Sequence, residues 1–219
     1  LHKAIRRQRQ MCIRDRYEMK YFTADTHFFH KELIHDTRFA NRMFFSVNDM
    51  NNTIVENWNS VVNDNDTVYH LGDIALINSK KEDLKRVLEI LKKLKGQIVF
   101  LKGNHDSRAL FKFIDKNNVI LPDGRMKFTF IDVGLILKLN HYQLFLTHYP
   151  LLVGPSKNRV NVHGHIHHSS VNSPWNINVG VDSADIDYLI NKLPFGTPIS
   201  EKNLFKIIEA KLIDHKKRW

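Results

Sequence analysis

The chain contains a single cysteine, Cys12, among its 219 residues. This scarcity excludes a fold stabilised by disulfides and a zinc site built from pairs of cysteines. No apolar run approaches the roughly 18 residues that span a bilayer, so we expect no membrane segment and no membrane partner. Internal repeats and low-complexity tracts are also lacking. With 42% hydrophobic and 26% charged residues, the composition is that of a globular protein, and the length favours one domain.

The amino-terminal stretch differs from the rest of the chain. Residues 1–18 carry six basic and two acidic side chains without apolar periodicity, whereas Met19 is followed at once by a strand-like run. We therefore expect residues 1–18 to be a non-native or disordered extension and residues 19–219 to form a single domain. The alternative is a basic arm that binds nucleic acid or anionic lipid. Because no apolar signal segment follows Met19, we expect a cytoplasmic protein.

Histidine and positive charge are abundant. The chain has 13 histidines, and 33 Lys and Arg against 23 Asp and Glu give a net charge of +10, or +6 without residues 1–18. Histidine is the commonest metal ligand and carries protons near neutral pH. A moderately basic balance supports an anionic substrate, but only weakly.

Apolar periodicity predicts strands that alternate with helices in the first half of the chain. The strands are expected at residues 20–24, 67–71 and 98–101. One helix should cover Val47–Val61 behind a Ser46 cap, a second should follow a capping box at Ser79 and end with Gly96 in the C′ position, and a third should cover Arg108–Lys116.

Shorter elements are predicted after residue 119. The stretch 121–128 reads as an insertion around a turn, and residues 135–139 and 144–147 should form a hairpin around Asn140 and His141. Further short strands are expected at 161–162 and 177–181, and Ser200 should cap a last helix. Early βαβ units followed by more antiparallel strands predict a layered α/β domain.

Polar side chains follow five of the predicted strands. They lie in the segments Asp25-Thr26-His27, Gly72-Asp73, Gly103-Asn104-His105-Asp106, His148 and Gly164-His165-Ile166-His167. Functional groups gather beyond the carboxyl ends of strands in open α/β sheets. The mixed carboxylate, amide and imidazole set fits two divalent metals such as manganese, iron or zinc. Ligands at i and i+2 would point to one side of an extended backbone.

These segments, read in order as DTH, GD, GNHD, H and GHIH, resemble the calcineurin-like metallophosphoesterase superfamily. The superfamily pattern is D-x-H, G-D, G-N-H-[DE], H and G-H-x-H, and the surrounding sequence is similar to that of small bacterial and phage members. The resemblance implies an α/β fold, namely a calcineurin-like layered α/β/β/α sandwich with two mixed sheets flanked by helices.

The resemblance also implies a role for each residue. Asp25, His27 and His167 would bind a first metal ion, and Asn104, His148 and His165 would bind a second. Asp73 would bridge the two ions, and His105 would protonate the leaving group. We expect two divalent ions, manganese first, with iron, zinc or nickel as alternatives. The implied reaction is hydrolysis of a phosphodiester or phosphomonoester, in a small phosphate ester or nucleotide, by a metal-bound hydroxide.

Two alternatives stay open. A nuclease would use the same chemistry on DNA or RNA, but its support is the basic balance alone, without the aromatic-basic interleaving that stacks single strands. A non-catalytic interaction scaffold would be expected to have lost some of the ligands. Protein phosphatases of the superfamily carry the motif G-D-x-x-D-R-G, and this chain lacks its second Asp and its Arg after Asp73. The residue that orients His105 is therefore not identified by the motif, and Asp106 is a candidate only because it is adjacent.

Other polar residues are open to a structural interpretation as well as a functional one. His70 and His163 are expected to be packed inside the fold. Four arginines are candidates to pair with phosphate, although surface roles are commoner: Arg38, Arg42, Arg108 and Arg159.

Overall fold

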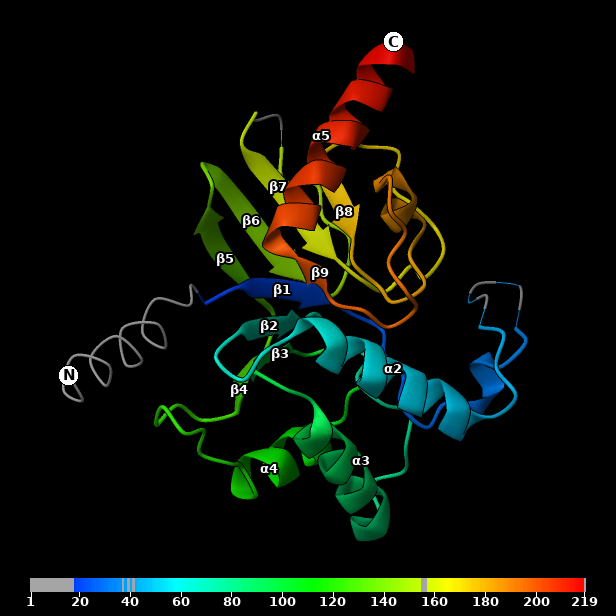
Figure 1. Ribbon diagram of the computed structural model, residues 1–219, viewed down its shortest axis with the longest axis vertical. Helices are drawn as coiled ribbons and strands as arrows, with labels where there is room; N and C mark the ends of the chain where they lie inside the picture. The colour runs from blue at the N-terminus through cyan, green and yellow to red at the C-terminus, as the bar shows by residue number, and fades with distance from the viewer. Residues whose placement is uncertain (1–17, 37, 39, 41, 155–156, 219) are drawn as a thin grey trace, which may run out of the picture.

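Two mixed β-sheets share a hydrophobic core and are flanked by helices (Figure 1). The computed structural model describes residues 18–36, 38, 40, 42–154 and 157–218. The predicted extension at residues 1–18 therefore lies outside the described residues, apart from Glu18. The arrangement confirms the fold class expected from the sequence.

The first sheet is parallel except at one edge. Its strand order is β4-β3-β2-β1-β9, and only β9 runs antiparallel, next to β1. The strands are β1 (Lys20–Thr23), β2 (Thr67–His70), β3 (Gln97–Leu101), β4 (Phe128–Ile131) and β9 (Ile199–Ser200). Because β1, β2 and β3 are parallel and in register, their carboxyl ends meet at one edge of the sheet.

The second sheet has the order β5-β6-β7-β8. Its strands are β5 (Gly134–Leu139), β6 (Tyr142–Thr147), β7 (Arg159–His163) and β8 (Asn176–Asn178). The predicted hairpin is confirmed, and Asn140 and His141 take the positive φ angles, 45° and 66°, that a two-residue turn of this hand requires. The antiparallel pairing expected after residue 119 is limited to this hairpin, because β6, β7 and β8 run parallel, and the sheet is mixed as the resemblance implied.

Helices cover the sheets and complete two hydrophobic cores. The helices are α2 (Val47–Val61), α3 (Lys81–Lys93), α4 (Arg108–Lys116) and α5 (Glu201–Arg218), with short 3₁₀ turns η1 (Lys31–Leu33) and η2 (Ala184–Tyr188). The first core joins α2, α3 and α4 to the first sheet, and the second joins both sheets to α5. None of the helices in the described part of the chain is long and apolar enough to cross a membrane.

Local signals predicted some helix ends and failed at others. Ser46 caps α2, since its side chain accepts a hydrogen bond from Asp49 N at 3.1 Å. The capping box at Ser79 was wrong, because α3 begins behind Lys80, which makes no side-chain cap. Gly96 was also wrongly placed at C′, since the helix has already ended at Leu94. Gly96 instead allows the loop after α3 to pack closely, because a Cβ at this position would lie 2.8 Å from Asp66 O.

Strand β4 was missed by the sequence interpretation. The stretch 121–128 was read as an insertion, yet β4 begins at Phe128 and pairs with β3. The strand is only four residues long and follows a turn, so its periodicity is too short to separate it from a loop.

Candidate metal centre

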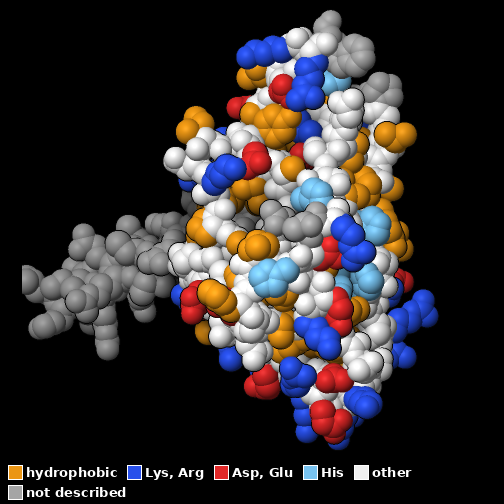
Figure 2. All heavy atoms as spheres, turned by 90° about the vertical axis from the view of Figure 1, so that its right-hand side faces the viewer, with side chains coloured by type: hydrophobic (Ala, Val, Ile, Leu, Met, Phe, Trp, Pro, Cys, Tyr) orange, Lys and Arg blue, Asp and Glu red, His pale blue; other side chains and the backbone are white. Residues whose placement is uncertain are grey.

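The structure brings together the eight polar side chains that the sequence singled out. They follow the carboxyl ends of β1, β2 and β3 in one sheet and of β6 and β7 in the other: Asp25, His27, Asp73, Asn104, His105, His148, His165 and His167. Histidine side chains gather near the middle of one face of the molecule, with basic and hydrophobic side chains around them (Figure 2). The site is therefore built at the junction of the two sheets.

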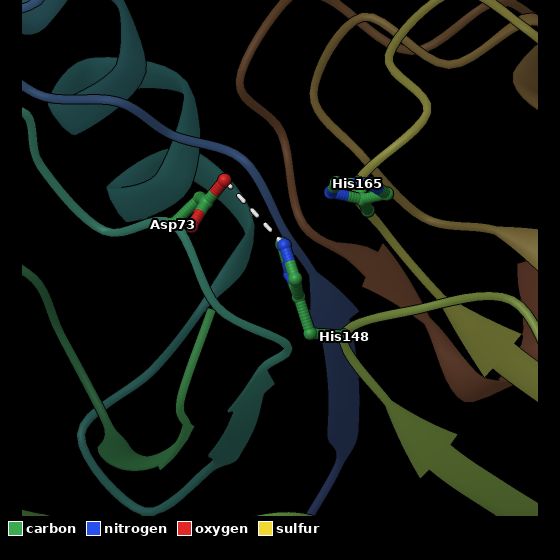
Figure 3. Close-up of side chains that lie close together, drawn as sticks. All are labelled: Asp73, His148 and His165. Atoms are coloured by element: carbon green, nitrogen blue, oxygen red, sulfur yellow. Dashed lines mark ion pairs between the residues drawn. The ribbon is translucent and has the colours of Figure 1, made fainter. Parts of the chain in front are cut away.

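Asp73 stands at the centre of the cluster. Its Oδ2 atom lies 3.5 Å from His27 Nε2 and 3.5 Å from His148 Nε2. Two groups of side chains could each hold a metal ion, one made of Asp73, His148 and His165 and the other of Asp25, His27 and Asp73. Figure 3 shows the first group, with Asp73 and His148 facing each other from different sheets. Asp73 is the member that both groups share.

Asn104 lies between two histidines of the first group. Its Oδ1 atom is 2.8 Å from His148 Nε2 and 2.9 Å from His165 Nδ1. The other nitrogen of His148, Nδ1, donates to Leu71 O at 2.8 Å, which fixes the ring and leaves Nε2 directed toward Asp73 and Asn104. A backbone acceptor on the far nitrogen is the usual way in which proteins orient a metal-binding histidine.

The second group contains buried atoms that make no hydrogen bond. Among the described residues, Asp25 Oδ1 and His27 Nε2 are buried and have no hydrogen-bond partner. The other oxygen of Asp25, Oδ2, accepts from His165 N at 2.9 Å, and the His167 ring lies 5.2 Å from the His27 ring. An unpaired buried polar atom costs about 1–3 kcal/mol. A cation would satisfy both atoms, so the residues present fit a metal ion.

The backbone at the site is unusual. Five of the seven predicted ligands lie in the left-handed region, with φ between 46° and 72°: Asp25, His27, Asp73, His165 and His167. The expectation that the i and i+2 ligands share an extended backbone was therefore wrong. Such conformations are uncommon outside glycine and collect at functional sites. Backbone hydrogen bonds hold the segments, including Asp25 N to Gly72 O and His27 N to Asp73 O, both 3.0 Å.

Two glycines allow the loops to approach closely. A Cβ on Gly103 would collide with Asp73 N and Oδ1, and a Cβ on Gly164 would lie 2.5 Å from Asp25 Oδ2. Contacts below 3.0 Å between a Cβ and backbone require the backbone to move. Glycine at these two positions is thus a condition for the positions of Asp73 and Asp25.

Burial and neighbouring charges shift the pKa values in opposite directions. Burial raises the pKa of Asp25 to about 7. Burial also acts to raise the pKa of Asp73, but the hydrogen bond and charge of His148 outweigh it and hold that pKa below its usual range. Burial, and then the charge of Arg42, keeps the pKa of His27 well below its ordinary value. His27 is therefore a neutral imidazole, the form that binds metals.

An aspartate that was not assigned a role orients His167. Asp182 Oδ2 accepts from His167 Nδ1 at 3.1 Å and from Arg42 Nε at 2.9 Å. The guanidinium of Arg42 also donates to Asp25 O and Thr26 O, and its side chain is fully buried. The suggestion that Arg42 pairs with phosphate was thus wrong. Asp182 lies 140 residues beyond Arg42 in the chain, in the segment 178–182, and no local sequence signal links the two residues.

Asp106 has a structural role that its position next to His105 in the chain did not predict. Its carboxylate accepts hydrogen bonds from Asp73 N, Ile74 N and Gly103 N, at 2.8 to 2.9 Å. It therefore ties the loop after β2 to the loop after β3. The suggestion that it orients His105 was wrong, because its oxygens are directed at these backbone groups.

His105 is exposed and borders a cleft of about 450 Å³, together with Asp73, Asn104, His165 and His167. Its backbone N–H donates to Asp73 Oδ1 at 2.8 Å, and its ring lies 5.4 Å from the His27 ring. His30 lies on the same side, with its Nδ1 3.2 Å from His27 Nδ1. The predicted packing of His70 and His163 is confirmed, since both are buried.

A cavity of about 500 Å³ lies elsewhere, between η2 and the end of α5. Its buried lysine, Lys211, donates to Asp185, Ser170 Oγ and Asn176 O at 2.8 to 2.9 Å. These charges are used in holding the fold together. The chemistry is therefore assigned to the cleft at Asp73.

Comparison with known proteins agrees with this geometry. A family model described as calcineurin-like phosphoesterase matches residues 21–208. The uncharacterized protein MJ1445 of Methanocaldococcus jannaschii is 36% identical over 146 residues, which cover 65% of this chain and 79% of that protein. The crystal structure of the protein of unknown function AQ665 from Aquifex aeolicus has a TM-score of 0.60 at 24% identity, over 87% of this chain and 99% of that one. The last likeness is one of fold.

Proposed function

The chain belongs to the calcineurin-like phosphoesterase family, and on that basis we propose that it hydrolyses a phosphodiester or phosphomonoester with two bound divalent cations. Membership of the family implies metal-dependent hydrolysis of phosphate esters. The observation that carries the proposal is the position of Asp73, which belongs to both groups of candidate ligands. A shared carboxylate is what a site for two adjacent ions needs.

The proposed ligands divide between the two ions as the motif pattern suggests. Asp25, His27 and His167 would hold the first ion, Asn104, His148 and His165 would hold the second, and Asp73 would be shared by both. The mixed oxygen and nitrogen donors suit manganese first, with iron, zinc or nickel as alternatives. When bound, such ions stabilise charge on the phosphoryl oxygens and lower the pKa of a coordinated water toward neutrality.

The protein's own residues complete the reaction. His105 is exposed, borders the cleft and is not one of the proposed ligands, so it is placed to donate a proton to the departing ester oxygen. A general acid of this kind contributes roughly 10²–10⁴-fold to the rate. A cleft of about 450 Å³ suits a small phosphate ester or a nucleotide. The cytoplasmic location stays a prediction.

Hydrolysis assays test the proposal. Bis-p-nitrophenyl phosphate, p-nitrophenyl phosphate and single-stranded DNA are each incubated with the protein and manganese, and again with a chelator. We expect hydrolysis of at least one small ester, lost on chelation and restored by added metal. Cleavage of DNA alone would establish the nuclease alternative, and no turnover by metal-loaded protein would establish the scaffold.

Variants assign the roles. Asp73→Asn should abolish activity together with metal occupancy, because one charge that faces both ions is lost. His105→Ala should keep both ions and slow hydrolysis most for poor leaving groups. The matched control is His168→Ala, since His168 is exposed and outside both ligand groups. Equal losses for good and poor leaving groups would refute the general-acid role, and full activity of Asp73→Asn would refute the bridge.

A further inference from the structure

An exposed aromatic ring stands beside the cleft. Tyr149 follows His148 at the end of β6, and 48% of its surface is exposed. Its ring centroid lies 4.6 Å from the His165 ring and 5.0 Å from the His148 ring, with interplanar angles of 63° and 75°. Leu151 and Leu152 follow in the chain with 43% and 92% exposure, and the exposed segment 149–152 is the apolar rim. A single exposed apolar residue has no special meaning, but several in one segment that adjoins a histidine of the cleft are typical of a ligand-binding surface.

Buried asparagines hold this rim in place. Asn161 is fully buried, and its side chain accepts from Leu151 N at 2.7 Å and donates to Thr147 Oγ1 at 2.8 Å. The Thr147 hydroxyl in turn donates to Tyr149 O at 2.7 Å. Asn176, also buried, donates to Leu151 O at 2.9 Å. Hydrogen bonds from neighbouring side chains thus fix the backbone at Tyr149 and Leu151, on both sides of Pro150, although the side chains of these two residues are exposed.

A fixed apolar surface binds with little loss of conformational freedom. Surface side chains on a loose loop lose entropy when they are ordered, whereas the backbone of this rim at Tyr149 and Leu151 is already held by hydrogen bonds. Tyr149 also offers more than apolar area, because a second ring packed on it gains electrostatic attraction between the rings. An alkyl group would gain burial alone.

We propose that Tyr149 and the rim at Leu151 bind the organic group of the substrate, and that this group carries a planar aromatic ring, as in an aryl or nucleoside ester. The inference rests on the proposed function, since it places the phosphate in the cleft beside His165. It narrows the substrate class from any small phosphate ester to esters of aromatic groups. It also makes Tyr149 a determinant of specificity rather than of the chemical step.

Two phosphonates with the same charged group separate ring binding from phosphate binding. Phenylphosphonate and methylphosphonate are titrated calorimetrically into manganese-loaded wild type, Tyr149→Ala and Tyr149→Phe. Ile136→Ala, on the edge strand β5 and 57% exposed, is the matched control. We expect wild type, Tyr149→Phe and Ile136→Ala to bind the phenyl compound about tenfold more tightly, and Tyr149→Ala to lose that preference while its affinity for methylphosphonate stays within twofold.

The outcomes are distinct. Equal affinities of the wild type for the two phosphonates, or an equal loss for both in Tyr149→Ala, would overturn the inference. Absence of ester hydrolysis in every sample with the phenyl preference intact would overturn the proposed function and support the ring-binding surface. Adenosine monophosphate identifies the source of the ring: tight binding that depends on Tyr149 indicates a nucleoside ester, and weak binding indicates another aryl ester.

Discussion

The substitution Asp182→Asn tests how the buried pair of Asp182 and Arg42 supports His167. Asparagine keeps the shape of the side chain but removes its charge, so Arg42 loses its counter-ion. The pair is buried, with 0% and 3% of the Arg42 and Asp182 side chains exposed and 2.9 Å between the charged atoms. Removal of one partner of a buried pair costs about 3–5 kcal/mol. Since Arg42 keeps its bonds to Asp25 O and Thr26 O, we expect a loss of about 3 kcal/mol in the free energy of unfolding.

Denaturant unfolding at neutral pH measures this loss. The control is Asp187→Asn, which removes an exposed aspartate paired with the exposed Lys192 and should leave stability nearly unchanged. A second readout is manganese affinity, which should fall about 10–100-fold because Asp182 orients the ring of His167. A stability loss no larger than that of the control would refute the ion-pair argument. Lost stability with unchanged affinity would show that Asp182 supports Arg42 but not the metal centre.

Two further predictions concern packing and pH. Gly103→Ala should lower activity about 100-fold, because its Cβ collides with Asp73. Gly124→Ala adds a Cβ with nothing within 4 Å, and its positive φ of 88° strains only an exposed turn, so it should keep full activity in the same ester assay. Burial lowers the pKa of His163 to about 4 from 6.5, so its contribution to stability is complete above pH 6.5 and is lost as the pH falls toward 4. Between pH 7.5 and 5 the wild type should lose about 2 kcal/mol more than His163→Gln, and equal losses in denaturant unfolding would contradict this.

Elements with strong local signals were predictable from the sequence. Helix α2 begins behind Ser46 because that hydroxyl caps the first turn, and the turn at Asn140 and His141 closes a hairpin because asparagine tolerates positive φ. Strand β4 and the parallel pairing of β7 with β8 were not predictable in the same way. Those features depend on which strand lies alongside, and a strand of three or four residues carries too little periodicity to show it.

The candidate site, too, was only partly predictable from the sequence. The eight polar side chains were found because each follows a strand whose carboxyl end reaches the junction of the two sheets, so position in the chain indicated position in space. Their roles stay predictions until metal binding is measured. The residues that support them were not found, because Arg42 and Asp182 are 140 residues apart and meet only through the fold.

The left-handed backbone at the ligands explains why such support is needed. Conformations of this kind cost of order 1–3 kcal/mol each and persist only where surrounding contacts over-determine them. Arg42 binds the carbonyl oxygens of Asp25 and Thr26, and Asp106 binds the N–H groups that flank Asp73. Buried charge is therefore placed where it fixes backbone rather than substrate. A motif of five short segments can indicate the ligands, but the geometry that makes them converge is set by residues outside the ligand set.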